Sequence, residues 1–223
     1  MKFFEKLMYP ILVVLIFFYM FYARTNPIYF ETVLAREGGP LQWLIICTLL
    51  FASAMCFYRA SILKPFRGGV FAACSIVSGF VFLVFAMDEL SWGQVIFNYQ
   101  TPEFIAVRNS MGEMNLRHLV VAGFEFTDVV FTLGIKVLAT LYFIVLPFFY
   151  SRLDKIKNFV NRFAIPLPRY TQTAAYAVAA ILMSFIPSTL RHIVFEFVFY
   201  WILVLMMYNP LNDEVFSRKT LVR

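Results

Sequence analysis

The chain has 223 residues, of which 61% are hydrophobic and 14% are charged, and its mean hydropathy is +0.77. Soluble domains carry about 25% charged and about 45–50% apolar residues, so this composition excludes an ordinary soluble protein and indicates one integral membrane domain, residues 1–223. The formal charge of +6 comes from short basic clusters between apolar runs. That placement is typical of membrane topology signals and argues against nucleic acid as a partner.

Apolar segments alternate with polar connections along the whole chain, and we predict an all-α bundle of about six transmembrane helices. The first segment follows Lys2 and Lys6, and no small-x-small cleavage site follows it, so we expect a retained span rather than a signal peptide. Gly68 and Gly69 separate the second segment from the third. The basic, amphipathic stretch 151–169 is expected to lie on the membrane surface. The predicted spans are residues 8–23, 40–58, 70–87, 125–150, 171–186 and 192–208.

The basic residues divide unequally between the two sides of this predicted bundle. Thirteen lie on the side of the termini: Lys2, Lys6, Arg59, Lys64, Arg67, Arg152, Lys155, Lys157, Arg162, Arg169, Arg218, Lys219 and Arg223. Five lie on the other side: Arg24, Arg36, Arg108, Arg117 and Arg191. Because basic loops stay in the cytoplasm, we predict a multi-pass protein of the bacterial inner membrane with both termini cytoplasmic.

A polar segment, residues 88–118, follows the third span on the predicted outer side. Adjacent carboxylates such as Asp88 and Glu89 raise one another's pKa when poorly solvated, which suits proton transfer, although a solvated helix end has the same pattern. A short amphipathic helix is expected at about 102–111. The predicted catalytic residues are Asp88, Glu89, Glu113, His118 and Glu125, and the predicted substrate-binding residues are Trp92, Gln94, Asn115, Arg117 and Arg191.

A second group of charged residues falls within the last three apolar segments. On a continuous helix from His118 to Lys136, the side chains of His118, Glu125 and Lys136 share one stripe, with Asp128 on the same half. His192 and Glu196 are likewise one turn apart. Charges inside a span face other protein rather than lipid, either as an interhelical ion pair or as a working site. The predicted intramembrane charge network is Asp128, Lys136, His192 and Glu196.

Metal chemistry is left open by the residue pattern. Two histidines and several glutamates would suffice for a dinuclear site, but no Glu-x-x-His pair is present. Cys47, Cys56 and Cys74 stand alone in apolar runs and are expected to be buried small residues. The residue pattern leaves the cofactor unknown.

The polar segment also resembles a known signature. The string from Asp88 to Leu116 is similar to the form acidic-Glu-[Ile/Leu]-Ser-Trp-Gly-Gln-x-[Ile/Leu]-Phe, then Thr-Pro-Glu, then Asn-x-x-Gly-Glu-x-Asn-Leu-His, found in a set of uncharacterised bacterial polytopic membrane proteins. The matching residues are Glu89, Ser91, Trp92, Gly93, Gln94, Phe97, Thr101, Pro102, Glu103, Asn109, Glu113, Asn115 and Leu116. Since that family has no known function, the resemblance implies a shared site and no activity. One departure is that Arg117 stands where the signature has histidine, and His118 follows it.

Three classes of function remain open from the sequence. The first is a membrane-embedded enzyme, or a binder, that acts on a lipid or lipid-linked substrate at the outer leaflet, where an arginine would hold an anionic head group. The second is a non-catalytic subunit or assembly factor of a larger membrane complex. The third is a small proton-coupled transporter. The expected partners are the lipid bilayer and either a lipid substrate or another membrane protein.

Overall fold

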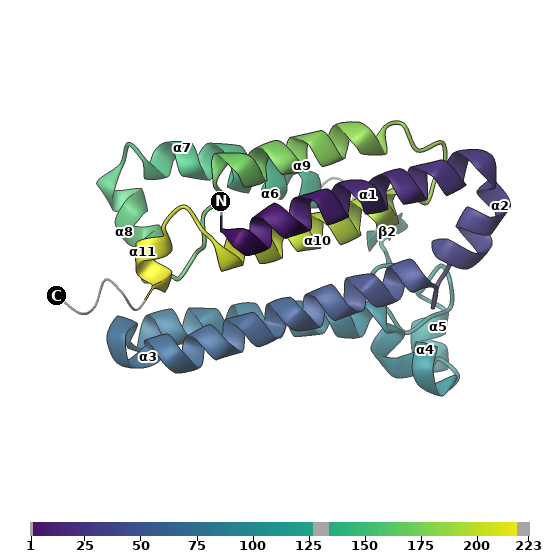
Figure 1. The fold of residues 1–223 in the computed structure, drawn as a ribbon. Helices are drawn as coiled ribbons and strands as arrows, with labels where there is room; N and C mark the ends of the chain where they lie inside the picture. The colour runs from purple at the N-terminus through teal and green to yellow at the C-terminus, as the bar shows by residue number, and fades with distance from the viewer. Residues whose placement is uncertain (1, 127–133, 218–223) are drawn as a thin grey trace.

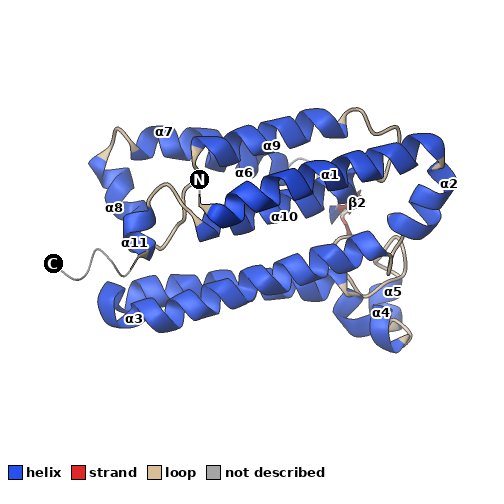
Figure 2. Ribbon diagram, viewed as in Figure 1, coloured by secondary structure: helices blue, strands red, loops and turns tan. Residues whose placement is uncertain are grey.

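The computed structural model describes residues 2–126 and 134–217, without the side chains of residues 135 and 136, and it is mostly helical (Figures 1 and 2). The first half contains α1 (Phe3–Thr25), α2 (Pro27–Tyr29), η1 (Phe30–Leu34), α3 (Pro40–Glu89), η2 (Ser91–Gly93), α4 (Gln94–Phe97) and α5 (Glu103–Ala106). The second half contains β1 (Val120–Val121), β2 (Phe124–Glu125), α6 (Ile135–Thr140), η4 (Leu141–Val145), α7 (Leu146–Tyr150), α8 (Asp154–Arg162), α9 (Tyr170–Met183), α10 (Arg191–Tyr208) and α11 (Asp213–Phe216).

Three helices in the described part of the chain are long and apolar enough to cross a membrane: α1, α3 and α10. Helix α10 packs against both α3 and α9, and α1 packs against α10 and α9. The core between them is made of branched aliphatic and aromatic side chains, among them Leu12, Leu49 and Phe197. The predicted helical fold is therefore confirmed, with three helices that could span a membrane.

Helix α3 contains the second and third predicted segments in one 50-residue element. Gly68 has φ 83° and ψ 176° inside it, a conformation that glycine adopts without the steric cost of a Cβ. There the chain turns back, and the two parts of α3 lie side by side (Figure 1). The Ser53 hydroxyl donates to the Gly79 carbonyl at 2.8 Å between these parts. The helix continues past the predicted end at Tyr58, because Arg and Lys are good helix formers whose long side chains reach water from a helix end.

The close approach of the two parts of α3 depends on Gly79. A Cβ at this position would lie 2.8 Å from Cε1 of Phe57. We expect Gly79→Val to lower the free energy of unfolding by about 1–3 kcal/mol through overpacking, seen as a lower melting temperature of the detergent-purified protein. Gly69→Ala is the matched control, since a Cβ there meets nothing within 4 Å. Equal melting temperatures for both variants would contradict the close packing.

Polar side chains join α1, α9 and α10 at the end of the bundle where the N-terminus lies (Figure 1). Glu5 is fully buried and accepts hydrogen bonds from the Gln172 amide at 2.9 Å and the Asn209 amide at 2.8 Å. A buried carboxylate is tolerated only with such partners. This contact network was not predicted, because its members are far apart in the sequence.

The stretch that leads into the predicted fourth span, residues 125–150, is a β-hairpin. Strands β1 and β2 form a hairpin that pairs Val120 with Glu125. Its two-residue turn, Ala122-Gly123, has φ values of 53° and 82°, and two positive φ values define a turn whose twist matches a β-hairpin. Phe126 is helical, residues 127–133 lie outside the described part of the chain, and α6 begins at Ile135. The predicted helical stripe from His118 to Glu125 is therefore replaced by a hairpin.

Two residues of the predicted charge network cannot be placed. Asp128 lies outside the residues that the structure describes, and so does the side chain of Lys136.

The helix predicted at 102–111 is reduced to the single turn of α5. After it the chain forms turns and one antiparallel bridge between Asn109 and Leu119, in which Ser110 N–H bonds the His118 carbonyl at 2.8 Å and Val120 N–H bonds the Arg108 carbonyl at 2.7 Å.

Candidate functional site

Three segments that are distant in the sequence meet around a cavity of about 480 Å³. They are the turn at residues 35–39, the end of α3, and residues 111–118, with the start of α10 closing the fourth side. This volume lies in the range of ligand-binding pockets. The cavity is lined by Ala35, Arg36, Glu37, Gln42, Asp88, Glu89, Met111, Glu113, Asn115, Arg117, His118, Leu190, His192 and Ile193.

The backbone directly after α3 is strained. Ser91, Trp92 and Gly93 have φ values of 46°, 55° and 102°, and the first two carry side chains that disfavour the left-handed region. Such strain is held in place only by surrounding contacts and concentrates at functional sites. Here the Trp92 indole donates to the Asp88 carboxylate, and the Ser91 hydroxyl donates to Glu113 Oε2 at 3.2 Å. The strained turn thus brings Ser91 to Glu113, which lines the cavity.

Two buried asparagines shape the polar segment. Asn109 Oδ1 accepts the backbone N–H groups of Met111 and Glu113 at 3.0 and 3.1 Å, and its amide donates to the Asn115 carbonyl at 2.9 Å. The Asn115 side-chain amide donates to Glu113 Oε2 at 2.7 Å, and its side-chain oxygen Oδ1 accepts the His118 N–H at 3.1 Å. An amide side chain both donates and accepts, so this pair holds Glu113 and His118 in one arrangement.

Arg117 joins the polar segment to two helices. Its Nη2 bonds Glu89 Oε1 at the end of α3 and lies 3.0 Å from Glu196 Oε2 on α10. Burial alone would lower the pKa of Arg117, but Glu196 and Glu89 raise it above its ordinary value, so the guanidinium stays charged. Asp88 Oδ1 accepts the Leu116 N–H at 2.7 Å. These contacts favour a positioning role for Asp88, Glu89 and Arg117.

His118 is oriented by a carboxylate on the hairpin. Its Nδ1 lies 2.8 Å from Glu125 Oε1, which also accepts the Ser110 hydroxyl at 2.5 Å. The bonds from Ser110 and His118 lower the pKa of Glu125, so Glu125 is ionised and accepts a proton-bearing Nδ1. His118 Nε2 is then the nitrogen left to act as a base, and it lies 4.0 Å from Glu37 Oε1.

Glu37 and Glu113 form a carboxyl pair in the cavity. A hydrogen bond with Glu113, together with burial and repulsion from Glu113, raises the pKa of Glu37 to about 8, although Arg117 opposes the shift. Two carboxylates this close cannot both ionise easily, so the pair shares one proton at neutral pH. Gln42 supports the Glu37 turn, because it accepts the Gly38 N–H at 2.5 Å and donates to the Glu89 carbonyl at 2.7 Å.

The shared proton predicts a pH dependence of stability. The folded-state pKa of Glu37 is above its ordinary value of 4.5, so its contribution is complete below about pH 4.5 and is lost as the pH rises through about 8. The Glu37 side chain is 47% exposed, so solvent screening limits the loss to about 1 kcal/mol, or about 2–4 °C in melting temperature between pH 6 and 9. Glu113→Gln should remove most of this decline. Glu103→Gln, an exposed carboxyl outside the cavity, should leave it unchanged, and a decline that persists in Glu113→Gln would contradict the pair.

The remaining predicted residues lie at the edge of this arrangement. Gln94 braces the loop, because its amide donates to Thr101 Oγ1 at 2.8 Å and its oxygen accepts the Met114 N–H at 3.0 Å. Arg191 is exposed at the start of α10 and is not among the lining residues. His192 lines the cavity, and its Nδ1 bonds the Thr189 carbonyl at 2.9 Å. Glu196, one turn after His192, lies 3.0 Å from Arg117 Nη2.

Sequence reasoning missed Glu37, whose only signal was its place in a polar connection next to Gly38-Gly39.

Among the residues that the structure describes, no three His, Cys, Asp or Glu side chains are grouped to hold a metal ion. Comparison of the chain with known protein families, with curated proteins and with solved structures finds no match. The function is therefore argued from the site alone.

Proposed function

We propose that the protein is a membrane-embedded enzyme that performs acid–base chemistry on a lipid or lipid-linked substrate at the outer face of a bacterial inner membrane. The observation that carries the proposal is the convergence of His118 Nε2 with the Glu37–Glu113 pair on one cavity. A base and a shared proton within about 4 Å of each other are the two components that general acid–base catalysis requires.

The proposal includes a six-span topology with cytoplasmic termini. The two parts of α3, residues 40–67 and 69–89, are about 42 and about 32 Å long at 1.5 Å per residue, and each is long enough for a hydrocarbon core of about 30 Å. With α1, the α6–α7 segment, α9 and α10, they make six crossings. The excess of basic residues at the ends of the chain and at the bend of α3 supports cytoplasmic termini, which puts the cavity on the outer side.

Exposed apolar side chains beside the cavity support a lipid substrate. Phe97, Phe104 and Val107 are 76%, 70% and 80% exposed on the loop that carries α4 and α5. Large exposed apolar groups in a polar segment are stable where they enter the acyl boundary of a bilayer. A substrate that reaches the cavity from this side is therefore anchored in the outer leaflet.

The arrangement assigns a role to each group. His118 Nε2 takes the proton of an attacking water or hydroxyl, while ionised Glu125 stabilises the imidazolium that forms. The proton shared by Glu37 and Glu113 goes to the leaving oxygen, so the carboxyl pair is the acid. In each reaction His118 gains one proton and the carboxyl pair loses one. Ser91 and Asn115 hold Glu113. The string that resembles an uncharacterised family supplies Ser91, Glu113 and Asn115, and we propose that its members share this site.

The test uses the full-length protein reconstituted in vesicles of a bacterial polar lipid extract that contains polyprenyl-linked lipids. Mass spectrometry of the lipids should show one species consumed by the wild type, and Glu113→Gln should slow its loss by about 100-fold or more. Arg191→Gln, outside the cavity, should match the wild type. If no species changes, or if Glu113→Gln is as active as the wild type, the enzyme proposal fails. Loss of a co-purifying protein in Glu113→Gln would instead favour an assembly factor.

A further inference from the structure

An apolar cavity of about 440 Å³ lies between α3, α10 and the segment that carries α6 and η4. Its walls are mostly aromatic and aliphatic side chains, among them Phe82, Phe199 and Leu203. The volume lies in the range of about 300–1,000 Å³ that is typical of ligand-binding pockets. This cavity shares no lining residue with the candidate site, so it is a separate feature of the described structure.

Two residues that line this apolar cavity are also exposed on the outside of the bundle. Ser78 of α3 is exposed, and Leu138 of α6 is 66% exposed. The cavity therefore reaches the surface between these two helices. Helices α3 and α10 are long and apolar enough to cross a membrane, so in a bilayer this opening faces hydrocarbon. An apolar cavity that opens to hydrocarbon takes up an apolar chain rather than water.

The length of the cavity matches one leaflet of a bilayer. Ser75 and Phe85 both line it, and they are about 15 Å apart along α3 at 1.5 Å per residue. On α10 the cavity extends from Phe199 to Met207, which is about 12 Å by the same rise. Half of a hydrocarbon core of about 30 Å is about 15 Å. The cavity therefore has the length of a single acyl chain.

Arg59 gives this cavity one polar end. Of the described residues that line it, Arg59 is the only one with a charged side chain. Its guanidinium lies over the ring of Phe216, 4.9 Å from the centroid, and its Nη2 donates to the Met207 carbonyl. The described part of the chain gives Arg59 no carboxylate within ion-pair distance. Charged groups beside a span are normally paired, and a guanidinium has five N–H donors, so donors remain for an anionic ligand.

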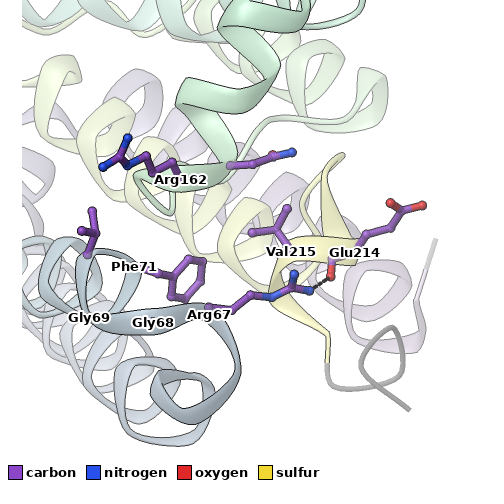
Figure 3. Close-up of a pocket in the computed structure, with 9 residues that line it drawn as sticks. Arg67, Gly68, Gly69, Phe71, Arg162, Glu214 and Val215 are labelled. Atoms are coloured by element: carbon purple, nitrogen blue, oxygen red, sulfur yellow. Dashed lines mark hydrogen bonds between the residues drawn. The ribbon is translucent and has the colours of Figure 1, made fainter. Parts of the chain in front are cut away.

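Packed side chains close the cavity on the side of the α3 bend. They are Leu63, Phe71, Ala164 and Val215, which form one hydrophobic cluster. Beyond this cluster lies a separate polar cavity, where Arg162 points away from Arg67 (Figure 3). Arg59 is about 28 Å along α3 from Pro40 at 1.5 Å per residue, which is near one edge of a hydrocarbon core of about 30 Å. An anionic head in the apolar cavity therefore meets Arg59 and not the arginines of the bend.

We propose that this cavity binds one long-chain fatty acid. The carboxylate pairs with Arg59, because a planar guanidinium matches a carboxylate through two parallel hydrogen bonds. The chain lies beside Leu203, with the open side at Ser78 and Leu138 facing the bilayer. One cation and a volume of about 440 Å³ favour a single-chain fatty acid over a two-chain phospholipid. The site does not depend on the acid–base chemistry proposed for the other cavity.

The test is native mass spectrometry of the detergent-purified full chain, titrated with palmitate or with hexadecanol, which has the same chain length and no charge. We expect one palmitate to bind at least about tenfold more tightly than hexadecanol, because hydrogen bonds between charged groups are strong. Equal binding of the two ligands would mean that the cavity holds any hydrocarbon chain, and it would overturn the proposal.

Substitution of Arg59 tests the carboxylate. Arg59→Gln should lower palmitate binding to the level of hexadecanol and leave hexadecanol binding unchanged. Lys64→Gln is the matched control, since it removes the same charge from an exposed position of the same helix outside the cavity, and it should change palmitate binding less than about twofold. Equal effects of the two substitutions, or equal loss of both ligands in Arg59→Gln, would contradict a carboxylate at Arg59.

Filling the cavity tests the chain. Leu203→Trp should weaken the binding of both ligands by about tenfold, and Ser78→Phe, at the open side, tests the same point if the first variant fails to fold. Val77→Phe adds the same ring at an exposed position outside the lining and should bind as the wild type does. Full binding in the filled variants would overturn the proposal. Displacement of palmitate by an equal concentration of phosphatidylglycerol would mean a phospholipid site and contradict a fatty acid.

Discussion

Arg117→Ala should be the most destabilising single substitution in the polar segment, residues 88–118. Glu89 is 7% exposed, and it and Glu196 would lose the cation that both contact. Removing one partner of a buried ion pair costs about 3–5 kcal/mol, because an uncompensated charge stays buried. At about 2–4 °C per kcal/mol, the melting temperature of the purified protein should fall by about 10 °C.

The charge balance explains which further substitutions should rescue this variant. Arg117→Met combined with Glu89→Gln and Glu196→Gln removes the whole ion group, and such replacements are often neutral, so most of the melting temperature should return. Arg108→Ala removes an exposed arginine from the same segment and should cost less than about 0.5 kcal/mol. A triple variant no more stable than Arg117→Ala would show that the packing of Arg117, and not its charge, is what matters.

Asn109→Ala should have the second largest effect, and it should act on the cavity as well as on stability. The substitution leaves the N–H groups of Met111 and Glu113 without their acceptor and frees the Asn115 carbonyl. Unsatisfied buried polar groups cost about 1–3 kcal/mol each, and water relieves part of this, so we expect a loss of about 3 kcal/mol.

The same substitution should also alter the carboxyl pair, because Asn109 positions Glu113. The decline of stability between pH 6 and 9 that we assign to Glu37 should become smaller in Asn109→Ala. Asn109→Asp is the informative comparison at a pH low enough to protonate the new carboxyl, since it then keeps an acceptor for the two N–H groups and loses the amide donor to Asn115. If Asn109→Asp is as unstable as Asn109→Ala, the hydrogen bonds from the Met111 and Glu113 N–H groups are not the main contribution of Asn109 to stability.

Composition and charge pattern were enough to predict a helical membrane domain and to single out the polar segment. The apolar content is too high for a water-facing surface, and the glycine pair at the bend of α3 breaks helix whatever it packs against. Glu113, Asn115, Arg117 and His118 were found because polar residues are costly near a span unless they have partners. Apolar content, helix breaking by glycine and the cost of a polar residue near a span are local properties, so they do not depend on how the helices pack.

Tertiary contacts decided which of those residues work together. The hairpin at Ala122-Gly123 replaced a predicted helix, because the pairing of 108–110 with 118–120 outweighs the helical preference of a short apolar run. Arg117 found Glu196, which is far away in the sequence, and Glu37 reached Glu113 only because the turn after η1 packs on the end of α3. Periodicity reports which face of an element is apolar, but the partner of a buried charge is set by how elements pack. The sequence by itself therefore determined the membrane domain and the place of its polar segment, and the packing determined which side chains meet around the cavity.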